Sequence, residues 1–267
     1  MKKINKSLSE KIHSNSRINY WNKDYLDYWR RRVDETHSSS VGSELVENDT
    51  KTSLDGFYHS CIDQLNIKSS DAVLELGCGY GRSLPKLLAL SNRITAVDIS
   101  DEMIKASSAM PGVEKVQFVV APSEDLPLPS DFFNKIICFA AFDAMYQTEA
   151  LKEMHRVSKF GAKILVTGKN IRYFPDDNLA LQAELAARKK GHPNFFTDVQ
   201  QLIRDLDHFG FKLIENLFFE RRGDFGLKWT NNQNPDFFYE YLLVVEKVNE
   251  WSANESKTYY KDKSTNT

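Results

Sequence analysis

Three glycines alternate with other residues at Gly77, Gly79 and Gly81, inside the stretch "VLELGCGYGRSLPKL" at residues 73–87. Glycine has no Cβ, so the backbone can turn sharply and approach a ligand closely at these positions. An apolar run precedes the glycines and a helical pattern follows them. This arrangement predicts a tight strand-to-helix turn whose backbone contacts a bound molecule.

Two acidic residues indicate what the glycine turn holds. Dinucleotide-binding turns follow the spacing G-x-G-x-x-G, whereas here the third glycine comes one residue earlier and Glu75 stands just before the turn. A carboxylate at that place favours a ligand with a positive amino group over a pyrophosphate. Asp98 ends the next apolar run and can accept hydrogen bonds from ribose hydroxyls. S-adenosylmethionine, a phosphate-free adenosine with cationic groups, has this chemistry.

The elements that must position these residues alternate between strand-like and helix-like patterns. Such alternation predicts a parallel sheet with helices on both faces. Two late strands have no long helix between them, so they can pair only in an antiparallel way. The predicted strands are 72–76, 94–98, 116–120, 135–141, 162–168, 211–220 and 238–248, and the predicted helices of this region are 82–91, 101–109, 147–158, 178–191 and 197–210.

Four stretches resemble, in order, the motifs of the class I S-adenosylmethionine-dependent methyltransferases of the small-molecule type. They read "VLELGCGYGRSL", "AVDIS", "SEDLPLPSDFFNKIICF" and "EMHRVSKFGAKILV". The resemblance implies an α/β fold, a Rossmann-like seven-stranded and mostly parallel sheet with an antiparallel last strand, plus an N-terminal helical cap. It also implies S-adenosyl-L-methionine as cofactor and S-adenosyl-L-homocysteine as product, bound at the carboxyl ends of the first four strands.

The resemblance gives roles to the residues that match its motifs. The glycine backbone contacts the methionine part of the cofactor, and Glu75 holds the turn. Asp98 takes the ribose hydroxyls, Ile99 packs on the adenine face, and Phe139 lies near the sulfonium. Ser123 and Glu124 flank the adenine edge. The expected cofactor-binding residues are Glu75, Gly77, Cys78, Gly79, Gly81, Asp98, Ile99, Ser123, Glu124 and Phe139.

The acceptor side is less marked, because methyl transfer from a sulfonium needs mainly orientation and exclusion of water. A general base is needed only for a hydroxyl or a protonated amine. Asp143 is the first catalytic candidate, because a carboxylate among apolar residues is costly to bury without a role; the alternative is a cap on the following helix. His192, in an insertion typical of substrate lids, is the second candidate.

Aromatic residues near the N-terminus form an amphipathic helical stripe that includes Tyr20, Trp21 and Tyr25. They are expected to stack on an acceptor or to surround the sulfonium through cation–π contacts. The alternative is that the stripe only packs this helix onto the sheet. Tyr146, next to the Asp143 segment, is a further expected contact of the acceptor.

The chain divides into four expected parts. Residues 1–17 are polar and expected to be flexible, and residues 18–66 form the helical cap or lid. Residues 67–248 form the S-adenosylmethionine-binding core, with a lid-like insertion at 169–200. Residues 249–267 form a polar, frayed tail.

Composition excludes several classes of protein. The chain has 35 basic and 37 acidic side chains and a net charge of −2, which gives no basic surface for nucleic acid. The three cysteines have no CxxC spacing, so neither a metal site nor a disulfide framework is expected. The N-terminus has no secretory pattern, and no apolar run reaches the roughly 18 residues of a membrane span. We therefore expect a cytoplasmic monomer or homodimer without a membrane partner.

The leading hypothesis is methylation of an oxygen or nitrogen of a small molecule, in secondary metabolism. Methylation of a protein or RNA is an alternative, although the chain has no basic stripe and no D/N-P-P-Y motif. A non-catalytic S-adenosylmethionine-binding regulator is another. An NAD-dependent oxidoreductase is disfavoured by the glycine spacing.

Overall fold

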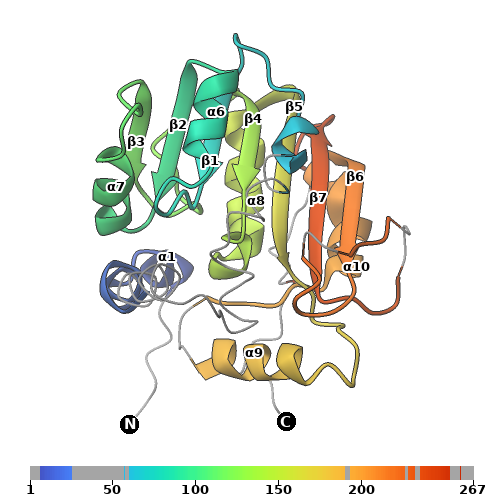
Figure 1. Cartoon of the computed structure of the whole chain (residues 1–267). Helices are drawn as coiled ribbons and strands as arrows, with labels where there is room; N and C mark the ends of the chain where they lie inside the picture. Colours follow the sequence, from blue (N-terminus) through green and yellow to red (C-terminus); the bar gives the residue numbers. More distant parts are fainter. Residues whose placement is uncertain are drawn as a thin grey trace.

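The computed structural model describes residues 7–25, 57, 60–189, 193–225, 228–231, 235–252 and 259 of the chain. Seven strands form one sheet in the order β3-β2-β1-β4-β5-β7-β6 (Figure 1). In chain order they are β1 (Ala72–Leu76), β2 (Arg93–Asp98), β3 (Val116–Val120), β4 (Phe133–Cys138), β5 (Ser158–Lys169), β6 (Phe211–Phe219) and β7 (Glu240–Lys247). The predicted Rossmann-like sheet is therefore confirmed.

Strands β1 to β5 are all parallel, whereas β7 runs antiparallel to both of its neighbours, β5 and β6. The antiparallel last strand was expected from the missing crossover helix, and the structure confirms it. Every residue of β1 is buried, as both-face coverage by helices requires.

Among the described helices, those that cover the sheet or its insertion include α6 (Leu84–Leu90), α7 (Asp101–Ser108), α8 (Gln147–Val157), α9 (Asn178–Lys189) and α10 (Val199–Asp205), which continues as the 3-10 helix η3 (Leu206–Phe209). The Ser100 hydroxyl accepts a hydrogen bond from Met103 N and begins α7. Asp198 begins α10 in the same way, through Gln201 N. In Figure 1, α9 lies apart from the sheet, beyond the lower ends of the strands.

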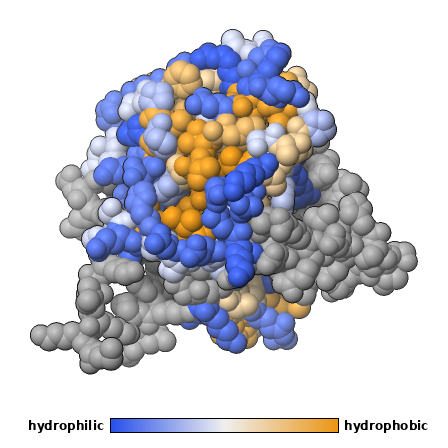
Figure 2. Space-filling model, turned by 90° about the vertical axis from the view of Figure 1, so that its left-hand side faces the viewer, coloured by the Kyte–Doolittle hydropathy of each residue, from blue (hydrophilic) through white to orange (hydrophobic). Residues whose placement is uncertain are grey.

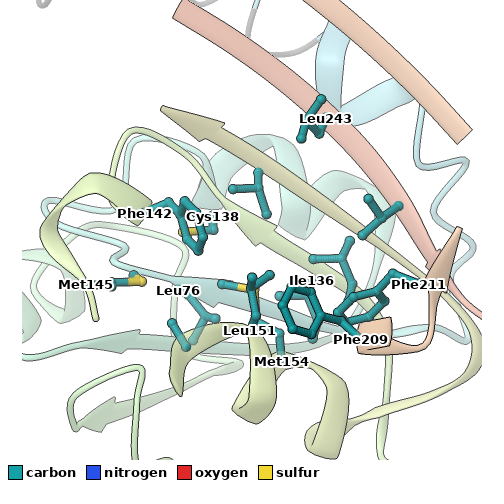
Figure 3. Close-up of a cluster of buried hydrophobic side chains, with 14 of the residues drawn as sticks. Leu76, Ile136, Cys138, Phe142, Met145, Leu151, Met154, Phe209, Phe211 and Leu243 are labelled. Atoms are coloured by element: carbon teal, nitrogen blue, oxygen red, sulfur yellow. The ribbon is translucent and has the colours of Figure 1, made fainter. Parts of the chain in front are cut away.

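The core has two layers, one on each face of the sheet, because alternate residues of a strand point to opposite faces. Leu74 and Leu76 of β1 belong to the layer under α8 and α10, whereas Val73 belongs to the layer under α6 and α7. Figure 3 shows the first layer, where Leu151 and Met154 of α8 meet the sheet. Full burial of one such side chain contributes about 1.5–3 kcal/mol, so both layers stabilise the strand ends that carry the site.

Strand β4 ends at Cys138, earlier than the predicted 135–141. The reason lies in the backbone of Ala140, which has a φ of +50°. A non-glycine residue in this left-handed region cannot continue an extended strand and carries some strain. Thr167 of β5 holds this bend, because its Oγ1 accepts a hydrogen bond of 2.7 Å from Ala140 N.

Within the segment 1–17 that was expected to be flexible, the described residues 7–17 are largely helical. Residues 8–24 form three consecutive helical segments, α1 (Leu8–Ile12), α2 (Asn15–Asn19) and the π-helix η1 (Tyr20–Asp24). Ser7 and Glu10 form a reciprocal capping box that begins α1. Arg17 is only 2% exposed, so this polar stretch is attached to the core. Most of the predicted cap at 18–66 lies outside the described residues.

The C-terminal tail, expected to be polar and frayed, also contacts the core. Trp251 stacks on Phe209 with ring centroids 4.6 Å apart. Tyr259 is buried, and its hydroxyl donates a 3.0 Å hydrogen bond to Asp205. The described residues of the tail are thus attached to the core through these two aromatic side chains.

The edge of the sheet at β3 is partly apolar on its surface. Figure 2 views the molecule from that side and shows a band of hydrophobic atoms between hydrophilic ones. Val120, at the end of β3, is 51% exposed. None of the helices in the described part of the chain is long and apolar enough to cross a bilayer.

Candidate cofactor and acceptor site

The glycine turn follows β1 and is fastened to β2. Gly77 N and Cys78 N both donate to the carbonyl of Val97, at 2.8 and 3.0 Å. Gly77, Gly79 and Gly81 have φ values of +69°, +51° and +78°, which other residues rarely adopt. A Cβ at Gly77 would lie 2.4 Å from the Cβ of Ala141, so that glycine is required for packing. A Cβ at Gly79 would meet nothing within 4 Å, so the turn is open to a ligand there.

Glu75 lies directly behind this turn and is 4% exposed. Its Oε2 atom is buried and has no hydrogen-bond partner among the described residues. Burial raises the pKa of Glu75 to about 7; the hydrogen bond with Ser83 opposes the rise and the charge of Asp98 adds to it. A buried carboxylate oxygen without a partner is unfavourable, and a ligand ammonium would satisfy it. The amino group of S-adenosylmethionine fits this requirement.

Asp98 lies at the end of β2, where its carboxylate is held by backbone groups. Gly79 N donates to one oxygen at 3.0 Å and Ser100 N to the other at 2.9 Å. Burial raises the pKa of Asp98, and these two backbone bonds oppose the rise. Each carboxylate oxygen has a second lone pair, so the side chain can still accept the ribose hydroxyls. Ile99, the predicted adenine contact, follows it and is partly exposed.

Ser123 and Glu124 are buried in the loop after β3. The Oε1 atom of Glu124 accepts hydrogen bonds from Arg17 Nη2 at 2.8 Å and from Tyr146 N at 2.7 Å. Its Oε2 atom is buried and has no partner in the described structure. Glu124 therefore joins the N-terminal helices to the loop after β4, in addition to any contact with adenine. Phe139 packs against the core layer under α6 and α7.

Arg17 is a residue of this site that the sequence did not indicate. Its Nη1 donates to Ile12 O at 3.2 Å, and its Nη2 donates to Ala144 O at 3.0 Å as well as to Glu124. The guanidinium also lies 5.4 Å from the centre of the Tyr146 ring. One side chain of α2 thus contacts both loops beside the predicted site.

The predicted aromatic residues Tyr20, Trp21 and Tyr25 lie together at η1. The Trp21 ring centroid is 5.1 Å from that of Tyr20 and 4.5 Å from that of Tyr25. Helix η1 contacts α7, the helix that follows Asp98. Figure 1 shows the N-terminal helices in blue, below the end of the sheet where β2 leads into α7. Their predicted role toward the acceptor stays a prediction.

Asp143 lies in the 3-10 helix η2 (Phe142–Ala144) after β4 and is 3% exposed. It does not begin the next helix, because Tyr146 is the residue at that position. Its carboxylate accepts hydrogen bonds from Lys169 N at 3.1 and 3.2 Å and from Lys169 Nζ at 3.1 Å. Burial raises the pKa of Asp143, and the Lys169 ammonium opposes the rise. The sequence did not reveal this buried ion pair.

Further polar side chains surround this ion pair. Gln147 Nε2 donates to Thr197 Oγ1 at 2.7 Å, and the Tyr241 hydroxyl lies 3.1 Å from the same oxygen. A Cβ at Gly168 would lie 2.6 Å from both Asp143 Oδ1 and the Tyr241 hydroxyl. The carboxyl ends of β4 and β5 and the insertion therefore meet in one polar cluster.

The insertion contains a pocket of about 380 Å³ near this cluster. Phe195, one of its lining residues, donates its backbone N–H to Asp143 O at 2.7 Å, and its ring lies 6.2 Å from that of Tyr146. The pocket is lined by Ile171, Arg172, Glu184, Ala187, Arg188, Asn194, Phe195, Phe196 and Asp198. His192, the second catalytic candidate, lies outside the described residues.

The described part of the chain contains no metal-binding cluster and no reactive cysteine in addition to the site above. Cys78 lies in the glycine turn, where burial raises the pKa of its thiol and keeps it protonated. No group of three or more His, Cys, Asp or Glu side chains that could hold a metal occurs among the described residues.

Comparison with known proteins agrees with this geometry. Residues 74–166 match a family described as a methyltransferase domain. An uncharacterized methyltransferase of Bacillus subtilis, YdaC, is 28% identical over 109 residues, which cover 40% of this chain and 60% of the relative. The UbiE C-methyltransferase of ubiquinone and menaquinone biosynthesis from Psychromonas ingrahamii is 26% identical over 162 residues, which cover 49% and 64%. The chain thus spans less than two thirds of the length of these two relatives.

A solved structure shares the fold over most of the chain. Geranyl diphosphate C-methyltransferase from Streptomyces coelicolor, in complex with S-adenosyl-L-homocysteine, has a TM-score of 0.64 at 13% identity and covers 88% of this chain and 99% of that one. The sheet order, the glycine turn after β1 and the acid ending β2 fit the motifs of the class I S-adenosylmethionine-dependent methyltransferases that the sequence resembles. Residues 74–166 match a methyltransferase domain, and the fold is shared over most of the chain.

Proposed function

We propose that this protein transfers a methyl group from S-adenosylmethionine to an oxygen or nitrogen of a small molecule, with a role in secondary metabolism. The observation that carries the cofactor part is the buried, unpartnered Glu75 Oε2 beside the open turn at Gly79. Bound S-adenosylmethionine supplies a methyl group that is already activated by its sulfonium. A cytoplasmic location and a monomeric or homodimeric state belong to the same proposal.

The protein's own groups would bind and orient the reactants. Glu75 would bind the cofactor ammonium. Asp98 would bind the ribose hydroxyls through its two carboxylate oxygens, which the backbone N–H groups of Gly79 and Ser100 hold in place. The N-terminal helices, attached through Arg17 and Glu124, would exclude water from the methyl group. Orientation and desolvation account for most of the rate in such displacements.

The acceptor would bind between the loop after β4 and the insertion. Support for a small-molecule acceptor comes from the pocket near Asp143 and from the names of similar proteins, which are C-methyltransferases of ubiquinone and menaquinone biosynthesis and of geranyl diphosphate. The alternatives, a protein or RNA acceptor and a non-catalytic binder, have no specific observation in their favour.

The first experiment is calorimetric titration of the purified chain with S-adenosylhomocysteine, with NADH in a parallel cell. We expect micromolar binding of the first compound and none of the second. Binding of NADH alone would make the protein an oxidoreductase. Binding of neither would overturn the cofactor site at Gly77–Gly81.

Asp143→Asn tests the acceptor side, because asparagine keeps the shape and removes the charge. We expect turnover to fall by about tenfold or more while S-adenosylhomocysteine affinity stays within about twofold. Equal loss of both would make Asp143 a structural residue only. The matched control is Asp125→Asn, whose exposed carboxylate lies 3.0 Å from His13 Nε2.

A further inference from the structure

The ion pair between Asp143 and Lys169 presents a positive charge on the acceptor side of the site. We propose that Lys169, held by Asp143 and assisted by Tyr239, recognises an acidic oxygen of the acceptor, so that the substrate is a phenol, an enol or a similar oxygen acid rather than an amine. This inference rests on the proposed function, whose acceptor atom it specifies.

The position of the pair follows from contacts with the glycine turn. The Cβ position of Gly77 lies 2.4 Å from the Cβ of Ala141 and 3.9 Å from Cε of Met145. Asp143 lies between these two residues in the chain, on η2. Lys169, at the end of β5, therefore lies one short loop away from the turn proposed to bind the cofactor.

Lys169 is the accessible member of the pair. Its side chain is 29% exposed, whereas the side chain of Asp143 is only 4% exposed. An ammonium has three N–H donors, and Nζ uses one of them, toward Asp143 Oδ2, within the described structure. A ligand would thus meet the cation and its free donors, not the carboxylate.

Tyr239 supplies a second donor near Lys169. Its hydroxyl is buried and has no hydrogen-bond partner among the described residues. Tyr239 lies beside Lys169 in the sheet, because Asn170 N donates to Tyr239 O at 2.7 Å and Lys169 pairs with Glu240. Burial raises the pKa of Tyr239; the charges of Lys169 and Arg222 oppose the rise, and those of Glu240 and Asp143 add to it. The hydroxyl therefore stays protonated and can donate to an oxygen anion. An anionic ligand oxygen would satisfy both this hydroxyl and the ammonium.

Charge then selects the acceptor. Asp143 and Glu240 lie beside Lys169, so the selection comes from its outward N–H donors: a protonated amine has no lone pair to accept them, and it would also be repelled by the cofactor sulfonium. An acidic oxygen is attracted instead, and a cation within hydrogen-bonding reach lowers its pKa by about one to three units. The acceptor O–H loses its proton to water, and the oxygen forms a bond to the methyl carbon. The C–S bond breaks as that bond forms, and its electron pair stays on sulfur as a neutral thioether.

The test uses 4-nitrophenol, whose phenolate is coloured, as a probe of the pKa of a bound phenol. Protein saturated with S-adenosylhomocysteine is titrated with the probe at several pH values. We expect the bound probe to have a pKa lower than the free probe by about one unit or more. Lys169→Met should abolish the shift, and Tyr239→Phe should reduce it while keeping the ring that packs on Tyr173 and Phe196.

Two controls keep the result interpretable. Tyr259→Phe removes the hydroxyl of another buried tyrosine, whose hydrogen bond goes to Asp205, and should leave the shift unchanged. Lys169→Met leaves Asp143 buried without its partner, so the double variant with Asp143→Asn removes both charges and protects folding. S-adenosylhomocysteine affinity, measured on each variant, verifies that the cofactor site is intact.

The outcomes separate this inference from the proposed function. A probe that fails to bind, binds without a shift, or keeps its shift in Lys169→Met overturns the inference while S-adenosylhomocysteine still binds. Loss of S-adenosylhomocysteine binding in the wild-type protein overturns the proposed function itself. A shift that disappears only in the Lys169 variants supports the assignment.

Discussion

In the protein without ligand, ionisation of the buried Glu75 carboxyl is unfavourable. Its pKa is about 7, against an ordinary value of 4.5, mainly because it is buried. Between these two pH values the folded protein binds more protons than the unfolded chain. The free energy of unfolding therefore falls as pH rises through this window.

We predict a loss of about 3 kcal/mol of stability from Glu75 between pH 4.5 and pH 7, since each pKa unit corresponds to about 1.4 kcal/mol. Urea unfolding at several pH values measures it. Glu75→Gln cannot ionise, so its free energy of unfolding should vary less with pH in this window. Saturating S-adenosylhomocysteine should have the same effect on the wild-type protein, because the ligand ammonium then faces the carboxylate. Equal slopes in wild type and variant would show that another group titrates.

Asp98 makes a second residue-scale prediction. Asp98→Ala removes a charged acceptor of hydrogen bonds, worth about 1.5–3 kcal/mol, so S-adenosylhomocysteine affinity should fall by roughly ten- to a hundredfold. Glu102→Ala, on the exposed side of α7, is the matched control and should bind normally. Calorimetric affinity that is the same in Asp98→Ala and wild type would mean that the ribose binds elsewhere.

Sequence alone identified Glu75 and Asp98, because both follow from local order: an acid before a glycine turn and an acid ending a strand. It could not identify the pairs of Arg17 with Glu124 and of Lys169 with Asp143. Their partners are 107 and 26 residues apart in the chain, so only the folded sheet brings them together. Asp143 itself was predicted as a candidate because it is a carboxylate in an apolar segment, but no sequence pattern indicated its partner, Lys169.

At the scale of elements, the attachment of α1 and α2 depends on Arg17. We predict that Arg17→Ala lowers the amide protection of residues 8–19 by roughly a hundredfold to several thousandfold in hydrogen exchange, since breaking a buried ion pair costs about 3–5 kcal/mol. Protection in β1 and β4 should not change, because the core layers do not depend on this contact.

His13→Ala is the control for this experiment. The His13 and Asp125 side chains are 45% and 68% exposed, and such a surface pair contributes about 0–1 kcal/mol. Uniform loss of protection over the whole chain in Arg17→Ala would instead show that the N-terminal helices and the sheet unfold together.

Elements were predictable where one physical signal dominated. The parallel strands were predicted from their largely apolar sequences, and β1 is buried along its whole length because both of its faces are covered. The early end of β4 was not predictable, since it results from the left-handed backbone of Ala140 and its bond to Thr167. The ordered N-terminus was missed because its polar sequence is held by one buried arginine.

At the scale of the whole molecule, the order of the strands makes β7 indispensable. This strand fills the gap between β5 and β6 and pairs with both. We predict that a chain ending after residue 239 neither folds nor binds S-adenosylhomocysteine. Strand β6 then has no partner strand, and each core layer loses one leucine of β7, Leu243 from the layer under α8 and α10 and Leu242 from the layer under α6 and α7.

A chain ending after residue 252 is the comparison. It keeps β7 and Trp251 but lacks the buried Tyr259, so we expect it to fold with a lower melting temperature and unchanged ligand affinity. Circular dichroism and calorimetry measure both properties. Normal folding of the shorter chain would contradict the role given to β7.

The late position of β7 also affects synthesis of the protein on the ribosome. Translation delivers β5 and β6 before the strand that must join them, so one edge of each strand is unpaired in the nascent chain until β7 follows. Unpaired strand edges are able to pair with other chains. The growing polypeptide is therefore expected to need chaperone protection until β7 has left the ribosome, and slow decoding of the codons for β7 would lengthen that exposed period.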